Sequence, residues 1–354
     1  MEQLFLPRYT LGERALDELE TMVRPYGNRL ALIHGEKAYK ACRHLLDEAV
    51  KGFEITANLD YGKEASWPVI DALLADEGVR KADVLIGAGG GKCLDVVKVV
   101  GHKLHKPVFT VATIASTCAA VTKISIIHNP DGSFREIVKL EQPPVHCFII
   151  SGVIAASPEK YFWAGMGDAM AKHVECCFSA KNDELDFLSE YGRTISSLCY
   201  EPMLKQGREA FEDVKKQKLS SEVEQIISAI IVATGSVSLA VHPNYNGAVA
   251  HALYYGMTVR PWMEQKHLHG EIVSYGTLVN LAMDKQYDEL KRVYDFNVSI
   301  GLPTKLKDLG LDREDPLDDI LSATVVNQEL THVPYPITKE LVREAIDYLE
   351  DYYG

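Results

Sequence analysis

The stretch "LIGAGGGKCLD", residues 85–95, decides the fold. It joins the apolar run "ADVLIGAGG" (82–90) to a helical pattern, "KCLDVVKVVGHKL" (92–104). Because glycine has no β-carbon, a pyrophosphate can approach the backbone of Gly89, Gly90 and Gly91 closely, and the first amides of the helix point toward it. Lys92 adds a positive charge. The stretch predicts a phosphate-binding turn between a strand and a helix, and the competing interpretation is a tight turn that happens to use glycines.

The glycine spacing narrows the class of nucleotide site. It matches neither the usual dinucleotide pattern GxGxxG nor the P-loop, which requires GxxxxGK[ST]. A kinase-like or NTPase function is therefore disfavoured.

The residues around this turn repeat the same strand–helix unit. Strands are predicted at 29–34, 53–58, 82–90, 107–113 and 145–151, and helices at 36–50, about 65–77 and 92–104. Strands separated by helices of this length indicate βαβ units and a parallel sheet. Residues 126–138 differ, because two short strands flank the turn sequence Asn129-Pro130-Asp131-Gly132 and predict a hairpin.

From Ser157-Pro158 onward the pattern becomes helical, with few convincing strands. We therefore predict two domains with a boundary near 156. Residues 1–156 form a dinucleotide-binding α/β domain, and residues 157–354 form a helical domain that binds metal and substrate and supplies the other wall of a cleft.

Composition excludes several classes of partner. The chain has 354 residues, 47% of them hydrophobic, and a net charge of −13, so a soluble protein that repels nucleic acid and anionic membranes is predicted. The seven cysteines include no CxxC pair, which favours a reducing compartment. The start of the chain is too charged for a signal peptide, and no run of about 18 apolar residues predicts a membrane span. A cytoplasmic location is expected.

The end of the first predicted strand leaves the dinucleotide open. Many dinucleotide-binding folds place an acidic residue there for the adenosine ribose. This chain has His34-Gly35-Glu36-Lys37, with no aspartate at the strand end. Both NAD and NADP remain possible.

Three polar residues of the helical half are candidates for a metal site. Asp168 lies among small residues at the start of a helix, His251 lies on an apolar helix, and His269 precedes another helix. One carboxylate and two imidazoles with an open position suit a catalytic Zn²⁺ or Fe²⁺. A helix cap, a core histidine and a surface histidine are the alternative interpretations. Four other histidines compete as ligands: His128, His173, His242 and His267.

Residues 113–125, "TIASTCAAVTKIS", combine small and hydroxyl side chains with one cysteine. The composition is too polar for a buried strand and too apolar for a solvated loop, and it indicates a segment that a ligand approaches closely. No histidine in a recognisable base motif accompanies Cys118, so a nucleophilic role is disfavoured.

Taken together, these motifs resemble the glycerol dehydrogenase branch of the iron-containing alcohol dehydrogenases. The resemblance is carried, in order, by "GAGGGKCLD", "TIASTCAAVTKIS", "AGMGDAMAKHVE", "HALYYGMTV" and "HGEIVSYGTL", and it extends to "GLP" at 301–303. It implies a Rossmann-like N-terminal domain and an all-helical C-terminal domain, as in dehydroquinate synthase and glycerol dehydrogenase.

The resemblance also implies roles for individual residues. Asp168, His251 and His269 fall on the metal ligands of the family, with Zn²⁺ favoured over Fe²⁺, and Gly91 and Lys92 fall on its pyrophosphate loop. The positions that line the nicotinamide and its ribose are Thr113, Ser116, Thr122 and Ile124. The metal polarises the substrate oxygen while hydride passes to or from the nicotinamide. No side chain beyond the metal ligands stands out as the acid or base.

Two departures from the glycerol enzymes bear on the substrate. Those enzymes carry an aspartate, in the pattern STDAPT, where this chain has Cys118, and a tyrosine where it has His128. The segment "STCAAVT" is closer to the hydroxycarboxylate dehydrogenase subgroup, which reduces short 2-oxo acids. Losing a carboxylate removes repulsion against an anionic substrate, and Lys123 is a nearby candidate cation.

We therefore predict an NAD(P)-dependent dehydrogenase for a small 2-oxo or 2-hydroxy acid. The alternatives are a glycerol or other polyol dehydrogenase, a non-catalytic nucleotide-binding protein, and a lyase similar to dehydroquinate synthase. The lyase is disfavoured because no cluster of Lys and Arg surrounds the candidate metal ligands. Relatives of this kind form homo-oligomers, and the expected partners are a small-molecule substrate and copies of the chain itself.

Overall fold

The computed structural model describes residues 3–352, which divide into two compact units. The α/β unit comprises Phe5–Glu159 and also Asp213–Ile227. The helical unit comprises Lys160–Glu212, residues 228–352 and the described residues before Phe5. A short stretch of the C-terminal half thus packs with the α/β unit, which the sequence did not indicate. The functional division at 156 stays a prediction.

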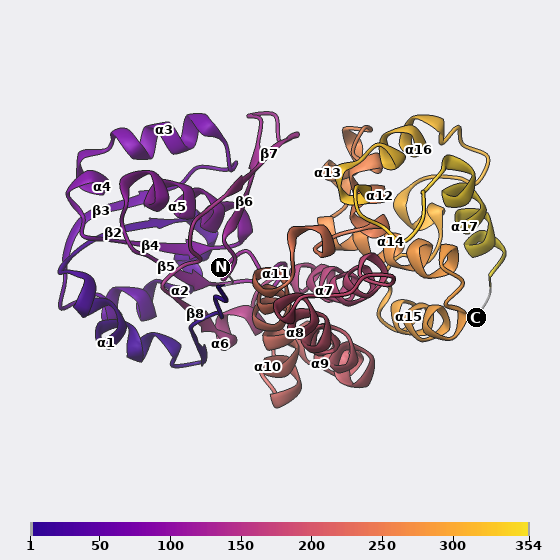
Figure 1. The fold of residues 1–354 in the computed structure, drawn as a ribbon. Helices are drawn as coiled ribbons and strands as arrows, with labels where there is room; N and C mark the ends of the chain where they lie inside the picture. The colour runs from indigo at the N-terminus through magenta and orange to yellow at the C-terminus, as the bar shows by residue number, and fades with distance from the viewer. Residues whose placement is uncertain (1–2, 353–354) are drawn as a thin grey trace. The chain divides into compact units, whose positions relative to one another are not determined.

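The α/β unit contains a six-stranded sheet in which every neighbouring pair of strands is parallel (Figure 1). The strand order is β1-β8-β5-β4-β2-β3. The strands are β1 (Tyr9–Gly12), β2 (Arg29–His34), β3 (Glu54–Asp60), β4 (Val84–Gly89), β5 (Val108–Ala112) and β8 (His146–Ile150). The predicted parallel sheet is confirmed, and β1 is an additional edge strand.

Helices cover both faces of this sheet, because alternate residues of each buried strand point to opposite faces. On β2, Leu30 and Leu32 pack into a core with α1 (Leu19–Val23) and α2 (Glu36–Ala49). Ala31 and Ile33 pack into a second core on the other face, with α3 (Trp67–Ala75) and α5 (Gly91–Leu104).

Two further predicted elements of this unit are present. The hairpin is confirmed as β6 (Ile124–His128) paired antiparallel with β7 (Phe134–Lys139). The helix expected at about 65–77 is confirmed as α3, and a separate helix that was not predicted, α4 (Glu77–Lys81), follows it. Asp76 has an extended backbone, and its side chain accepts a hydrogen bond from the amide of Val79, so it caps α4.

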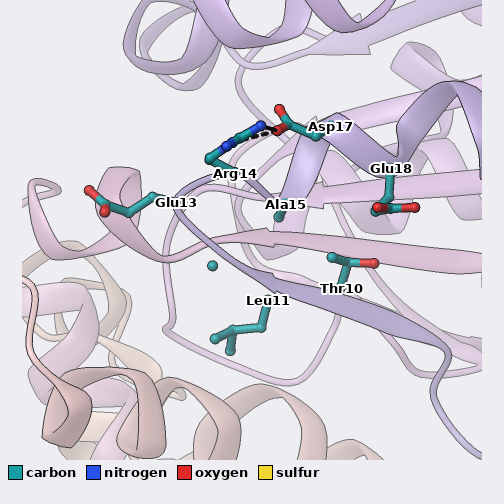
Figure 2. Close-up of a pocket in the computed structure, with 8 residues that line it drawn as sticks. Thr10, Leu11, Glu13, Arg14, Ala15, Asp17 and Glu18 are labelled. Atoms are coloured by element: carbon teal, nitrogen blue, oxygen red, sulfur yellow. Dashed lines mark hydrogen bonds and ion pairs between the residues drawn. The ribbon is translucent and has the colours of Figure 1, made fainter.

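A shallow hollow lies where β1 ends (Figure 2). Its lining includes the acidic residues Glu13, Asp17 and Glu18, and Arg14 Nε donates to Asp17 Oδ2 at 2.6 Å. The hollow contains none of the predicted site residues.

The helical unit has no strand among its described residues. Its site-bearing helices are α7 (Glu159–Ser179), α12 (Val249–Met257) and α14 (His269–Met283). The others begin with α8 (Phe187–Ile195), α9 (Arg208–Lys215), which runs on into the segment grouped with the α/β unit, α11 (Thr234–Ala240) and α13 (Trp262–Lys266). They end with α15 (Tyr287–Ile300), α16 (Asp318–Val325) and α17 (Lys339–Asp351), while α10 (Ser221–Ile227) belongs to the α/β unit.

The stretch Ser221–Ala240 is long and apolar enough to cross a membrane by length and composition alone. Because 61% of its apolar window is buried inside the protein, it has the character of a core segment. It is weak evidence for a membrane span.

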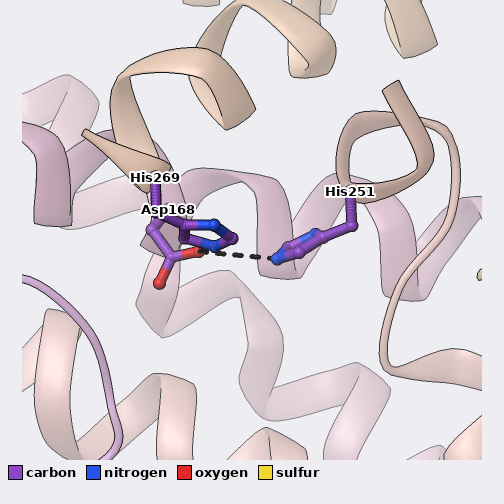
Figure 3. A group of neighbouring side chains, drawn as sticks. All are labelled: Asp168, His251 and His269. Carbon is purple, nitrogen blue, oxygen red and sulfur yellow. Dashed lines mark ion pairs between the residues drawn. The ribbon is translucent and has the colours of Figure 1, made fainter. Parts of the chain in front are cut away.

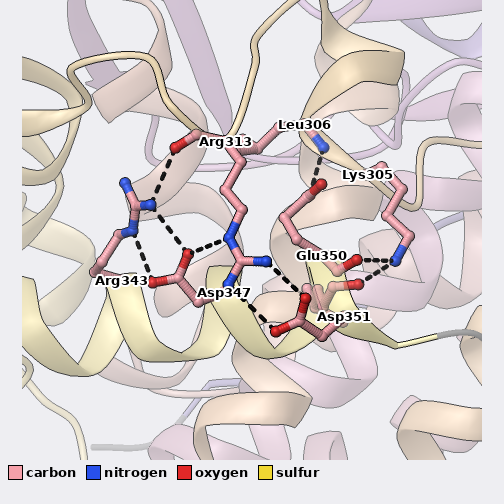
Figure 4. A network of polar contacts seen from close by, with 8 residues as sticks. Lys305, Leu306, Arg313, Arg343, Asp347, Glu350 and Asp351 are labelled. Carbon is pink, nitrogen blue, oxygen red and sulfur yellow. Dashed lines mark hydrogen bonds and ion pairs between the residues drawn. The ribbon is translucent and has the colours of Figure 1, made fainter.

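The C-terminal helix α17 is anchored by charged groups (Figure 4). Lys305 Nζ donates to the carbonyl oxygens of Leu349, of Glu350 at 2.9 Å and of Tyr352 at 2.6 Å. The last carbonyls of a helix lack the amide partners of its interior, so the ammonium satisfies the C-terminal end of α17. The amide of Tyr352 also donates to the carbonyl of Leu349, at 3.1 Å. Arg313 pairs with Asp351 on the same helix, at 2.6 Å.

Candidate metal centre and dinucleotide loop

Asp168, His251 and His269 converge in the helical unit (Figure 3). They come from α7, α12 and the first residue of α14, and one ligand atom from each lies within 4.8 Å of the others. Asp168 Oδ1 is 3.6 Å from His251 Nε2 and 3.3 Å from His269 Nε2. Among the residues that the structure describes, this is the one group of histidine, cysteine and carboxylate side chains arranged to hold a metal ion.

Close helix packing at two glycines brings Asp168 and His269 together. A β-carbon on Gly270 would lie 2.0 Å from the carbonyl oxygen of Ala164, and one on Gly167 would lie 2.5 Å from the carbonyl oxygen of Gly270. Glycine at both positions therefore lets α7 and α14 approach backbone to backbone beside the two ligands.

Glu175 holds the third ligand, His251, in place. Glu175 lies seven residues after Asp168, which is two turns along the same face of α7. Its side chain is fully buried, and Oε2 accepts from His251 Nδ1 at 2.5 Å. Its Oε1 accepts from the backbone amides of Ala248 at 2.8 Å and His251 at 2.9 Å, so the carboxylate also caps the start of α12. Glu175 was not predicted from the sequence, although its spacing from Asp168 is a signal that could have identified it.

These contacts shift the pKa values of Asp168 and His251. Burial alone would raise the pKa of the Asp168 carboxyl, but hydrogen bonds from His251 and His269 bring it well below its usual range. Burial likewise opposes a charged His251, yet the adjacent Glu175 and Asp168 carboxylates raise the pKa of this imidazole overall. In the metal-free protein, His251 therefore binds a proton that a metal ion would displace.

The donor set fits a divalent metal. Bonds of about 2.0–2.1 Å in tetrahedral geometry place two ligand atoms roughly 3.4 Å apart, close to the separations between Asp168 and the two imidazoles. Two imidazoles and one carboxylate are ligands that Zn²⁺ and Fe²⁺ both accept, with a position left for substrate. A histidine that binds a metal normally donates from its other nitrogen to a carboxylate or a backbone carbonyl. Glu175 is this partner for His251.

The competing histidines are engaged elsewhere. His128 lies 3.1 Å from Glu64, and His267 lies 2.8 Å from Glu271. His173 contacts Ser196 at 2.7 Å, and His242 Nδ1 accepts from the amide of Asn244. None of these histidines belongs to the metal-type cluster.

The glycine loop occupies the position at which parallel sheets bind ligands. In chain order, β3 is added on one side of β2, and β4 and β5 are added on the other side. The strand order therefore reverses between β2 and β4, and ligands bind at such a switch point, beyond the carboxyl ends of the strands. Gly35 follows β2, and its amide donates to the carbonyl of Ala88 on β4 at 3.2 Å. Gly89 ends β4, and Gly90 and Gly91 cap and begin α5.

The three glycines of this loop are there for different reasons. A β-carbon on Gly89 would lie 2.7 Å from Cβ of Cys93, and one on Gly90 would lie 2.5 Å from Cδ1 of Ile114. One on Gly91 would meet nothing closer than 3.4 Å. Packing within the protein explains Gly89 and Gly90, whereas it does not require glycine at position 91, where the predicted close approach of a phosphate would account for it.

The ammonium of Lys92 is paired with a carboxylate of the protein. Its ammonium lies 2.6 Å from Glu64 Oε2, and the other oxygen of Glu64 lies 3.1 Å from His128 Nδ1. Burial alone would raise the pKa of Glu64, but His128 and Lys92 lower it to about 2. Lys92 and His128 are therefore joined through one carboxylate.

The segment predicted to line the nicotinamide follows the neighbouring strand end. Thr113 comes directly after β5, and its amide donates to the carbonyl of Gly89 at 3.4 Å. Thr113 and Thr122 are buried, Ser116 and Cys118 are half-buried, and Ile124 begins β6. Lys123 lies over the ring of Phe5, with Nζ 5.7 Å from the ring centroid.

Comparison with known proteins identifies the class. Residues 7–148 match the family model "iron-containing alcohol dehydrogenase". Across 99% of this chain and 96% of the relative, the sequence is 30% identical to a glycerol dehydrogenase of Thermotoga maritima. It is 29% identical to hydroxycarboxylate dehydrogenase A of Escherichia coli, over 92% of this chain and 90% of the relative.

A solved structure agrees with these sequence matches. The crystal structure of a probable glycerol dehydrogenase from Sinorhizobium meliloti 1021 superposes with a TM-score of 0.86 at 26% identity. The alignment covers 99% of this chain and 98% of that one.

The chain belongs to the iron-containing alcohol dehydrogenase family. Its relatives place it in the glycerol dehydrogenase-like branch, as the sequence motifs predicted. It is therefore a dehydrogenase that acts on CH–OH groups with a nicotinamide cofactor and a divalent metal. Membership of this family sets aside a non-catalytic protein and a lyase.

Proposed function

We propose that this protein interconverts a small 2-oxo acid and the corresponding 2-hydroxy acid, using NAD(H) or NADP(H). A divalent metal, Zn²⁺ in preference to Fe²⁺, is held by Asp168, His251 and His269. The substrate is a small molecule, and the enzyme acts in the cytoplasm as a homo-oligomer.

The convergence of Asp168, His251 and His269 carries this proposal. A divalent metal bound there supplies Lewis acidity toward the substrate oxygen. Glu175 accepts from His251 Nδ1, so the proton that a metal ion would displace is the one on Nε2, the atom that lies on the side of Asp168. The negative charge of Asp168 offsets part of the positive charge of a divalent cation, so the chain supplies an oriented set of ligands with one negative charge.

The α/β unit supplies the other reactant. Amides at the start of α5 bind the pyrophosphate beside Gly91, and the small side chains of residues 113–124 allow a nicotinamide ring to approach the backbone. Thr113, Ser116, Thr122 and Ile124 are the residues proposed to line it. The hydride moves directly between the nicotinamide and the substrate carbon, and the protein contributes position.

Cys118 supports a 2-oxo acid as the substrate. A half-buried thiol neither repels a substrate carboxylate nor accepts strongly from a polyol hydroxyl. The relative named hydroxycarboxylate dehydrogenase A is in line with this choice. His128 and Lys123 are further candidates for contact with the substrate.

A polyol is the second candidate. The relatives named glycerol dehydrogenase, such as that of Thermotoga maritima at 30% identity, favour glycerol or a similar polyol.

The two candidates are separated by following NAD(P)H absorbance at 340 nm. Purified protein is assayed with 2-oxobutanoate, dihydroxyacetone and glycerol, with and without added Zn²⁺. The proposal expects the highest kcat/KM for 2-oxobutanoate and a requirement for metal. A preference for glycerol and dihydroxyacetone would establish the polyol alternative, and Cys118→Asp should then change kcat/KM little.

A further inference from the structure

Lys98 is a buried cation in the middle of α5. Its side chain is 1% exposed, and its ammonium lies 2.9 Å from Asp95 Oδ1, one turn earlier. It also contacts three backbone carbonyl oxygens outside the helix: Ala119 at 2.8 Å, Thr122 at 3.4 Å and Ile124 at 2.5 Å. The hydroxyl of Thr122 is a further acceptor, at 3.4 Å.

Asp95 binds a backbone amide of the same stretch, whereas Lys98 binds its carbonyls. Its Oδ2 accepts from the amide of Ile126 at 3.1 Å. One turn of α5 therefore binds carbonyl groups through an ammonium and an amide group through a carboxylate, all within residues 119–126.

This stretch needs such partners because most of it lies outside regular structure. Residues 113–123 form neither a helix nor a strand, so regular structure leaves most of their carbonyls to other partners. Two of these carbonyls accept from backbone amides, Cys118 from Val121 at 3.1 Å and Lys123 from Leu140 at 2.8 Å. A second side chain, Thr110 on β5, donates from Oγ1 to the carbonyl of Ala120 at 2.7 Å. Lys98 and Thr110 hold neighbouring carbonyls from a helix and from a strand.

The same helix begins at the glycine loop. A β-carbon on Gly91 would lie 3.4 Å from Thr117 Oγ1 and 3.6 Å from Cβ of Ala119, so the loop and the 113–124 segment are adjacent. Helix α5 thus contacts the proposed pyrophosphate site at its first residue and the proposed nicotinamide segment two turns later, at Lys98.

We propose that Lys98 is a positioning residue for the cofactor, holding residues 119–124 in the conformation that receives the nicotinamide half of the dinucleotide. Lys98 touches neither the cofactor nor the substrate and acts through the backbone that it binds. This inference rests on the proposed function, because it requires a nicotinamide at this segment.

The test compares a whole dinucleotide with its adenine half. Lys98→Met keeps the length of the side chain and removes the ammonium, and Lys103→Met makes the same change at an exposed position of the same helix. Dissociation constants of NADH and of ADP are measured by calorimetry on the purified, folded full-length proteins. ADP reports on the glycine loop alone, whereas NADH reports on both halves of the site.

Lys98→Met should weaken NADH binding by about tenfold, which is the effect of losing one hydrogen-bonded anchor. It should leave the affinity for ADP within about twofold of the wild-type value. Lys103→Met should change the dissociation constant of neither ligand. An unchanged NADH affinity in Lys98→Met, or equal weakening of NADH and ADP, would overturn the inference, because Lys98 would then be a purely structural residue or one that acts on the glycine loop.

Thr110→Val keeps the inference testable if Lys98→Met does not fold. It removes a single hydrogen bond to the same segment, and it should weaken NADH about threefold while sparing ADP. Unchanged NADH affinity in a folded Thr110→Val protein would then count against the inference. Failure of the wild type to bind either NADH or NADPH would instead refute the proposed function itself.

Discussion

Glu175→Gln is the substitution that most sharply probes how the metal ligands are oriented. The amide has the shape of the carboxylate, and its oxygen can still accept from the amides of Ala248 and His251. Its nitrogen, however, is a donor that faces His251 Nδ1, where the native carboxylate accepts at 2.5 Å. His251 then presents a lone pair at Nδ1 and carries its proton on Nε2, the atom proposed to bind the metal.

The size of the effect follows from the one contact that is lost. A hydrogen bond between charged groups contributes about 1.5–3 kcal/mol, and outer partners of metal-bound histidines typically change metal affinity by about 10–100-fold. We expect Glu175→Gln to weaken Zn²⁺ binding within that range. The start of α12 also loses a negative charge, so the metal-free protein should lose about 1 kcal/mol of unfolding free energy.

The measurement is competition for Zn²⁺ against a chelator of known affinity, together with urea unfolding of the metal-free proteins. Glu159→Gln makes the same chemical change at an exposed position of α7, also at the start of a helix, and should leave the Zn²⁺ affinity at its wild-type value. Zn²⁺ affinity in Glu175→Gln within twofold of the wild type would refute the proposal that Glu175 sets the tautomer of His251.

Three further changes test other parts of the account. Gly270→Ala places a methyl group 2.0 Å from the carbonyl of Ala164, so it should cost about 1–3 kcal/mol by urea unfolding and weaken Zn²⁺ binding by separating α7 from α14. Lys305→Met removes the ammonium from the carbonyls that end α17 and should cost about 3 kcal/mol, seen as a lower Tm. Burial, with a smaller contribution from Arg8, lowers the pKa of His146 from 6.5 to about 4. Only the unfolded state therefore gains this proton as pH falls from 6.5 to 4, and stability should decline by up to about 3 kcal/mol; His146→Gln should flatten that decline in urea titrations at pH 7 and pH 5.

Much of the α/β unit could be predicted because each strand and helix there repeats its apolar pattern and the glycine loop marks one junction. Strand β1 could not, since it has only four residues and gains its hydrogen bonds from β8, which lies far along the chain. Helix α4 was not predicted, because Asp76, which caps it, is compatible with both a helix interior and a cap, and only its backbone conformation decides.

The candidate site was predictable to a different degree at each residue. Spacing alone left Asp168, His251 and His269 among several candidates, because helix–helix approach at Gly167 and Gly270 is a tertiary feature. Lys98 and Glu175 were not predicted, for a different reason. A charged residue in a helical pattern usually faces solvent, and only the structure reveals that both are buried against backbone groups that need partners.

The central claim is that this chain is a metal-dependent dehydrogenase whose metal is held by Asp168, His251 and His269. The most direct test is elemental analysis of purified wild type and His269→Ala, with NADH binding and turnover measured on the same samples. The account predicts one divalent metal per wild-type chain, and in His269→Ala a loss of metal and of turnover while NADH still binds with near-normal affinity. Full turnover by a metal-free His269→Ala protein would contradict it.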